Sequence, residues 1–166
     1  FVTFNAENNA KRLTFSNPII KQSIPDPTII KANDGYFYLY GTEDTRNMPI
    51  YRSRNLIDWM FVGTAFSEAT RPRTVNPYVG YKNSSGNTVT AMMWAPDINY
   101  INGQYVLYYA IGVWGVLNKS GVGVATSERP EGPFVDRGAM FISETIGVNN
   151  SIDQFYIEDG GKKYLV

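Results

Sequence analysis

The chain of 166 residues contains no cysteine and no histidine. Without cysteine it has no disulfide framework, no thiolate metal site and no cysteine nucleophile. Without histidine it has no Ser-His-Asp or Cys-His pair and no imidazole metal ligand. An excess of one charge is also missing, because fifteen basic and fifteen acidic residues cancel. We therefore expect neither nucleic acid nor a membrane surface as a partner, and the chemistry that remains is that of carboxylates.

Long apolar runs are absent as well, since none approaches the roughly 18 residues that a membrane-spanning helix needs. What the chain has in abundance is aromatic residues, with 3 Trp, 12 Tyr and 9 Phe, together with 15 Gly and 9 Pro. Helical periodicity is weak throughout, and short β-branched and aromatic runs alternate with turn residues. This composition is typical of an all-β protein rich in turns.

One sequence figure occurs three times: a strand, a glycine-containing turn and a partner strand. The predicted hairpins cover residues 28–40, 98–110 and 154–166, with turns at 33–35, 102–103 and 158–161. An aspartate precedes each copy, namely Asp26, Asp97 and Asp153. In the first two copies a third and a fourth strand follow, so the repeated unit is a four-stranded sheet.

Tandem four-stranded sheets are the signature of a β-propeller, whose blades pack around a central axis. We predict a lead-in at 1–16 and propeller sequence at 17–166, with blade 1 at about 26–66, blade 2 at about 94–141 and blade 3 from about 151. Residues 67–85 are predicted to form a long surface loop. Because a propeller has at least four blades, we expect this chain to be the N-terminal part of a longer protein.

The position of the aspartates suggests a shared site. The residue before the innermost strand of a blade lies at one mouth of the channel, so Asp26, Asp97 and Asp153 are expected to converge there. The alternative is structural, because an aspartate before a proline or a strand often caps a turn through its side chain.

The segments around these aspartates resemble glycoside hydrolase family 43, the five-bladed propellers that cleave arabinose- and xylose-containing polysaccharides. The resemblance runs from about residue 17 to 166. Its motifs stand in the order Ile24-Pro25-Asp26-Pro27-Thr28-Ile29-Ile30, Tyr36-Phe37-Tyr38-Leu39-Tyr40-Gly41-Thr42, Met93-Trp94-Ala95-Pro96-Asp97-Ile98, Gly123-Val124-Ala125-Thr126-Ser127 and Asn150-Ser151-Ile152-Asp153.

The resemblance implies an inverting mechanism with three carboxylates. Asp26 would be the general base that deprotonates the attacking water, and Asp153 would raise the pKa of the general acid and orient it. The acid itself, a glutamate on a later blade, would lie beyond Val166. The family often has proline after the third aspartate, where this chain has Gln154.

Sugar rings pack their C–H faces on flat aromatic rings, so the tryptophans are candidates for substrate binding. Trp94 and Trp114 are expected near the mouth of the pocket, as sugar platforms or alternatively as core. Trp59, in the repeat position equivalent to Phe134, is expected to take part in blade packing. For Asp97 we expect a place near the axis, where it either contacts substrate or organises the floor of the pocket.

The function expected from the resemblance is hydrolysis of α-L-arabinofuranosyl or β-D-xylosyl linkages, most like the arabinan-degrading members. The alternatives are a β-xylosidase or arabinoxylan arabinofuranohydrolase, a non-catalytic carbohydrate-binding propeller and a purely structural repeat domain. The partner would be an oligo- or polysaccharide such as arabinan or arabinoxylan. The protein itself would be extracellular or periplasmic. No cofactor is required, although the resemblance implies an axial Ca²⁺ in some members, which no residue here identifies.

Overall fold

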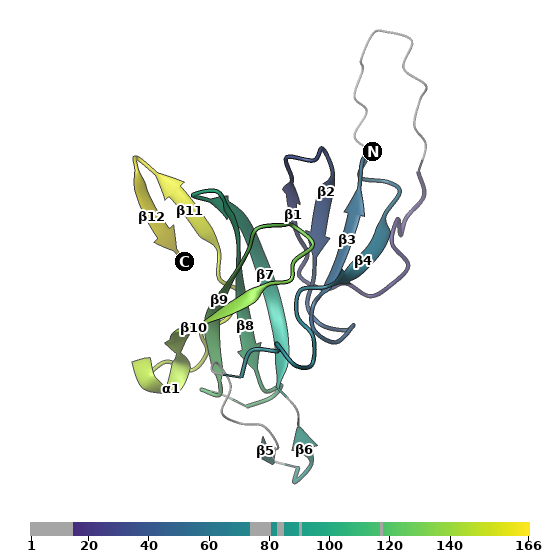
Figure 1. The fold of residues 1–166 in the computed structure, drawn as a ribbon. Helices are drawn as coiled ribbons and strands as arrows, with labels where there is room; N and C mark the ends of the chain where they lie inside the picture. Colours follow the sequence, from purple (N-terminus) through teal and green to yellow (C-terminus); the bar gives the residue numbers. More distant parts are fainter. Residues whose placement is uncertain (1–14, 74–80, 83–84, 90, 117) are drawn as a thin grey trace, which may run out of the picture.

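The structure, a computed structural model, describes residues 15–73, 81–82, 85–89, 91–116 and 118–166. Their strands form two four-stranded antiparallel sheets and two short hairpins (Figure 1). The helical content of this described part is one turn, α1 (Ser143–Ile146). The prediction of an all-β fold is confirmed. The predicted lead-in at 1–16 lies outside the described residues except for its last two.

The first sheet consists of consecutive hairpins in the order of the chain. Its strands are β1 (Thr28–Lys31), β2 (Phe37–Tyr40), β3 (Pro49–Ser53) and β4 (Met60–Thr64). The first turn closes because Gly35 adopts a φ of 83°, a conformation that costs glycine little. The Asp34 carboxylate accepts hydrogen bonds from the Tyr36 amide at 3.0 Å and from the Tyr38 hydroxyl at 2.8 Å. The predicted hairpin at 28–40 is therefore present.

The second sheet repeats this arrangement with longer strands. They are β7 (Met92–Ile101), β8 (Gln104–Gly112), β9 (Ser120–Ser127) and β10 (Val135–Ile142), in the order β10-β9-β8-β7. Asn102 and Gly103 have φ values of 51° and 83°, as a two-residue type I′ turn requires. The innermost strand begins at Met92 rather than at the predicted residue 98, because a bulge between Trp94 and Asp97 lets it continue through Pro96.

The third hairpin consists of β11 (Tyr156–Asp159) and β12 (Lys162–Leu165). Gly160 and Gly161, with φ values of 55° and 75°, form its turn. The predicted turn was longer and included residues 158 and 159. These two belong to the strand, because two glycines are sufficient to reverse the chain.

The predicted surface loop at 67–85 is only partly described, because residues 74–80 and 83–84 lie outside the described part. At its end the structure has a small hairpin that the sequence analysis did not predict, β5 (Tyr81–Lys82) paired with β6 (Thr88–Val89). The loop is also not confined to the surface, since Pro72 is buried and only 11% of the Arg71 side chain is exposed.

Aromatic side chains fill the space between the two four-stranded sheets. Phe66, which follows β4, meets Tyr109 of β8 edge to face, with 5.6 Å between ring centroids. Tyr40 of β2 meets Phe134 in the same way at 6.1 Å. Each such residue contributes about 1.5–3 kcal/mol when it is fully buried. The two sheets therefore pack on each other as adjacent blades, and the inner strands β1 and β7 are in contact.

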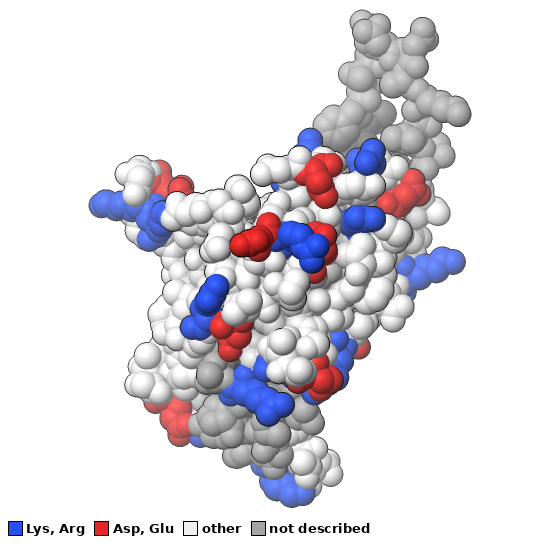
Figure 2. All heavy atoms as spheres, viewed as in Figure 1, with Lys and Arg blue, Asp and Glu red and all other residues white. Residues whose placement is uncertain are grey.

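The surface carries charges of both signs. In the face shown in Figure 2, basic and acidic side chains are interspersed, in line with a formal net charge of zero. No helix in the described part of the chain is long and apolar enough to span a membrane.

Candidate active site

Asp26 lies two residues before β1, where the first blade begins. Its backbone has a φ of 49°, a left-handed conformation that aspartate tolerates better than most residues and that is often found at functional sites. The residue is exposed. Its Oδ2 atom accepts a hydrogen bond of 2.7 Å from the hydroxyl of Thr42, which follows β2. Oδ1 accepts none from the described residues, and the residue as a whole is exposed.

The chain after β2 approaches Asp26 closely. A Cβ atom on Gly41 would lie 2.2 Å from Cγ2 of Ile24, so only glycine fits at this position. The amide of Thr42 donates a hydrogen bond of 2.9 Å to the carbonyl of Pro25. Main chain and side chain of Thr42 therefore both hold the segment that carries Asp26.

Asp153 occupies the corresponding place at the start of the third blade. It lies three residues before β11, is exposed and has a φ of 59°. The next residue, Gln154, is buried, with 6% exposure. Its Nε2 atom donates a hydrogen bond of 2.6 Å to the carbonyl of Ala95 on β7. The side chain after Asp153 therefore fastens the third blade to the second.

In the second blade the equivalent position belongs to Ala95, contrary to the expectation that Asp97 would occupy it. Ala95 has the left-handed φ, at 33°, and like Asp26 it stands directly before a proline. Asp97 comes two residues later, inside β7. The reason is the bulge between Trp94 and Asp97, which adds residues that the repeat spacing does not show.

Asp97 is buried, with 6% exposure, and it connects two blades. Its Oδ2 atom accepts hydrogen bonds from the amide of Tyr156 on β11 at 2.7 Å and from the side-chain amide of Asn99 at 3.0 Å. Burial raises the pKa of this carboxyl group, and the two hydrogen bonds partly oppose the shift. These contacts join the second and third blades, and the role of Asp97 at the floor of the site stays a prediction.

The two candidate sugar platforms lie against each other. The rings of Trp94 and Trp114 meet edge to face, with 6.1 Å between centroids and an angle of 85°. Trp94 is half-buried over Gly112, where a Cβ atom would lie 2.5 Å from the indole ring. Trp114 is 79% exposed, which is unusual for so large an apolar side chain. Trp59, expected to take part in blade packing, is half-buried and donates its indole N–H to the carbonyl of Leu56 at 3.1 Å.

A buried ion pair beside this site was missed by the sequence analysis. Both carboxylate oxygens of Glu43, the residue after Thr42, accept hydrogen bonds from the Arg71 guanidinium. They also accept the main-chain amides of Asn47 and Met93, each at 2.8 Å. Arg71 donates in turn to the carbonyl of Ala91 at 3.0 Å. The pair joins the first blade, the long loop and the inner strand of the second blade.

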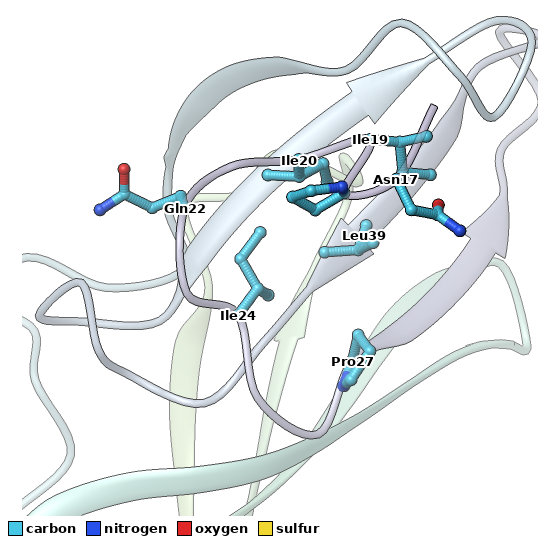
Figure 3. Close-up of a pocket in the computed structure, with 8 residues that line it drawn as sticks. Asn17, Ile19, Ile20, Gln22, Ile24, Pro27 and Leu39 are labelled. Atoms are coloured by element: carbon cyan, nitrogen blue, oxygen red, sulfur yellow. The ribbon is translucent and has the colours of Figure 1, made fainter. Parts of the chain in front are cut away.

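A cavity of about 580 Å³, which none of these carboxylates lines, lies between residues 17–27 and β2 (Figure 3). Ile19, Ile20, Ile24 and Leu39 give it an apolar lining, and Asn17 and Gln22 also border it. It contains no ionisable side chain, so it offers no acid or base for hydrolysis.

The residues of the site do not by themselves fit an axial Ca²⁺. No three acidic side chains of the described segments gather closely enough to hold a metal ion. Oε1 of Gln154 is buried without a hydrogen-bond partner there, but it is a single neutral oxygen. Calcium takes six to eight oxygen ligands, several of them carboxylates.

Antiparallel four-stranded sheets packed face to face, with aspartates on left-handed backbone before the first and third inner strands, identify this protein as part of a β-propeller. Residues 15–166 match glycosyl hydrolases family 43. The chain belongs to this family, and the resemblance found in its motifs is confirmed.

The chain is similar to several characterised members. It is 34% identical over 125 residues to the non-reducing end alpha-L-arabinofuranosidase BoGH43B of Bacteroides ovatus, covering 74% of this chain and 21% of that protein. It is 30% identical over 162 residues to a xylan 1,3-beta-xylosidase of a Vibrio species, covering 92% and 26%. It is 30% identical over 135 residues to the extracellular endo-alpha-(1->5)-L-arabinanase 2 of Bacillus subtilis, covering 80% and 27%.

Solved structures with this fold include two arabinanases. Native Bacillus subtilis arabinanase Arb43A superposes with a TM-score of 0.69 at 26% identity, covering 87% of this chain and 47% of that one. The Cellvibrio cellulosa alpha-L-arabinanase in complex with arabinohexaose gives 0.65 at 26% identity, covering 86% and 43%. The chain thus spans less than half the length of each of these proteins.

Proposed function

We propose that this chain forms part of an inverting glycoside hydrolase that cleaves α-L-arabinofuranosyl linkages in arabinan. The observation that carries the proposal is Asp26, an exposed residue on left-handed backbone, with one carboxylate oxygen bound by Thr42 and the other without a hydrogen bond from the described residues. Membership of family 43 supplies the reaction class.

In this proposal Asp26 is the general base. A water molecule hydrogen-bonded to Oδ1 attacks the anomeric carbon, and the carboxylate takes its proton as the new C–O bond forms. In the same step the glycosidic C–O bond breaks, and the general acid protonates the oxygen that leaves. Asp153 orients the general acid, a glutamate of a later blade, and raises the pKa of that glutamate. Inversion requires base and acid to stand about 6.5–9.5 Å apart, so that the water fits between them and the sugar. The carboxylates and water complete the reaction without a cofactor.

The exposed indole ring of Trp114, in contact with Trp94, is proposed as the sugar platform. An indole ring offers a flat apolar face to the C–H face of a furanose, and Trp114 keeps most of its surface accessible. Trp94 backs it from the side and is itself fixed over Gly112. The buried Asp97 would then support the floor of the site rather than contact the sugar.

The substrate is proposed to be arabinan, because both superposed arabinanases share this fold and one of them holds arabinohexaose. The similarity to a xylan 1,3-beta-xylosidase supports a β-xylosyl linkage as the second candidate. A place outside the cytoplasm is proposed because the Bacillus subtilis relative is named extracellular.

The test is hydrolysis by the full-length protein that carries this chain, with linear arabinan, arabinoxylan and nitrophenyl arabinofuranoside or xyloside as substrates. We expect Asp26→Asn to lower kcat at least about 10²-fold, the order expected when a general base is lost. Asp159→Asn is the matched control, because Asp159 is an exposed aspartate at the end of β11. The kcat of this variant is expected to equal that of the wild type.

Cleavage of the xylosides alone would assign the protein to the second candidate. If the wild type binds these sugars but cleaves none, the protein is a carbohydrate-binding propeller and the proposed hydrolysis is wrong. A polypeptide of residues 1–166 alone is expected to show no turnover, because none of its glutamates matches the motif of the general acid.

A further inference from the structure

We infer that Thr42 is a positioning residue of the proposed reaction, and that a polar line from Thr42 through Ala95 to Gln154 fixes the direction of the Asp26 carboxylate. The line crosses three blades. It deepens the proposed function and rests on it, because its effect is measured on the hydrolysis assigned to Asp26.

The hydroxyl of Thr42 has a defined direction. It accepts the main-chain N–H of Ala95 at 2.7 Å, and it is only 7% exposed as a residue. A hydroxyl has a single proton to donate. Because the Ala95 amide occupies its acceptor side, this proton is left for Oδ2 of Asp26, also at 2.7 Å. This bond holds Oδ2 and leaves Oδ1 without a hydrogen bond from the described residues, so that Oδ1 can accept the attacking water.

An exposed aspartate without such a partner populates several staggered χ1 rotamers. A general base must instead lie within hydrogen-bond reach of the water that it deprotonates. The Thr42 hydroxyl is the hydrogen-bond donor to Asp26 in the described part of the chain. Loss of this hydroxyl should therefore reduce the fraction of molecules with Oδ1 in place, without changing the surface that binds the sugar.

The other end of the line keeps Ala95 in place. Its carbonyl accepts Nε2 of Gln154, so both polar groups of its peptide backbone are hydrogen-bonded across blades. Gln154 contributes this bond although its own Oε1 atom is buried without a partner among the described residues. A buried unpartnered oxygen costs about 1–3 kcal/mol, which is tolerated where the rest of the side chain serves a purpose. The Gln154 side chain holds the carbonyl of Ala95 and thereby also anchors its own neighbour in the chain, Asp153.

The test compares Thr42→Val, Thr42→Ser and Thr28→Val in the full-length protein. Valine has nearly the shape of threonine but no hydroxyl, whereas serine keeps it. Thr28→Val is the matched control, since the Thr28 hydroxyl also accepts a main-chain amide of the second blade, that of Ile98 at 3.5 Å, but does not contact Asp26. For each variant kcat and KM are measured on linear arabinan, together with the thermal unfolding midpoint.

We expect Thr42→Val to lower kcat about 10-fold, equivalent to about 1.4 kcal/mol, with KM changed less than twofold. Thr42→Ser is expected to keep at least half of the wild-type kcat, and Thr28→Val to match the wild type. An unchanged kcat in a folded Thr42→Val, or an equal loss in Thr28→Val, would overturn the inference. Absence of hydrolysis by the wild type would instead contradict the proposed function itself.

If Thr42→Val does not fold, Gln154→Met decides. Methionine has a similar length but cannot donate to Ala95. The inference requires a lower kcat at unchanged KM, whereas wild-type kcat in this variant would contradict it.

Discussion

Removal of the Glu43 carboxylate is expected to be one of the most destabilising single changes in the chain. The Glu43 side chain is 3% exposed and that of Arg71 is 11% exposed. In Glu43→Ala the guanidinium stays buried without its counter-charge, and the amides of Asn47 and Met93 lose their acceptor. Breaking a buried pair by removing one partner costs about 3–5 kcal/mol. Each orphaned amide costs about 1–3 kcal/mol taken alone.

These contributions overlap, because alanine leaves space that water can enter. We therefore take about 4 kcal/mol as the expected loss in the free energy of unfolding. The assay is urea unfolding of the full-length protein, followed by tryptophan fluorescence and analysed by linear extrapolation. The double variant Glu43→Met with Arg71→Met is expected to lose less than Glu43→Ala, because no unpaired charge remains buried.

The control is the exposed ion pair between Arg46 and Glu68, whose side chains are 52% and 64% exposed. Water screens such a pair, so Glu68→Ala should cost about 1 kcal/mol or less. If Glu43→Ala costs no more than Glu68→Ala, then burial does not decide the strength of these pairs and the reasoning above is refuted.

Two further changes test the surroundings of the site. Asp97→Asn keeps an oxygen for the Tyr156 amide, so we expect it to be stable at pH 7, whereas Asp97→Ala should lose about 1–3 kcal/mol. Burial raises the pKa of Asp97, so the folded protein favours the protonated carboxyl group. The stability that this group contributes is complete at low pH and is lost as the pH rises through the raised pKa. Urea unfolding between pH 3 and 7 should show this loss in the wild type and not in Asp97→Asn. Gly112→Ala places a methyl group against the Trp94 ring and should cost about 1–3 kcal/mol, and Trp94→Phe in the same chain should recover part of this loss. Strict additivity of the two substitutions in thermal unfolding would contradict that contact.

Local chemistry made the hairpins predictable. A type I′ turn needs positive φ at two consecutive residues, and Asn102-Gly103 and Gly160-Gly161 supply it within two positions of sequence. The start of β7 was not predictable in this way. Proline normally argues against a strand interior, yet Pro96 lies inside β7 because a bulge accommodates it.

The residues that hold the site were missed for a different reason. Their partners are far away in the sequence: Thr42 and Ala95 are 53 positions apart, and Ala95 and Gln154 are 59 apart. The residue type alone, a threonine or a glutamine, does not predict such a contact. Arg71 lies in a polar, Gly/Pro-containing stretch that predicts a surface loop, and only the position of Glu43, 28 residues away, explains why it is buried.

The failed equivalence of the three aspartates shows what each blade contributes. Each blade has a left-handed residue at its inner strand, but only Asp26 and Asp153, which precede β1 and β11, carry a carboxylate there. In the second blade this place belongs to Ala95, which takes part through its backbone amide and carbonyl alone. The second blade thus connects the first blade to the third through the backbone of Ala95. Its own inner-strand carboxylate, Asp97, also binds the third blade, through the amide of Tyr156.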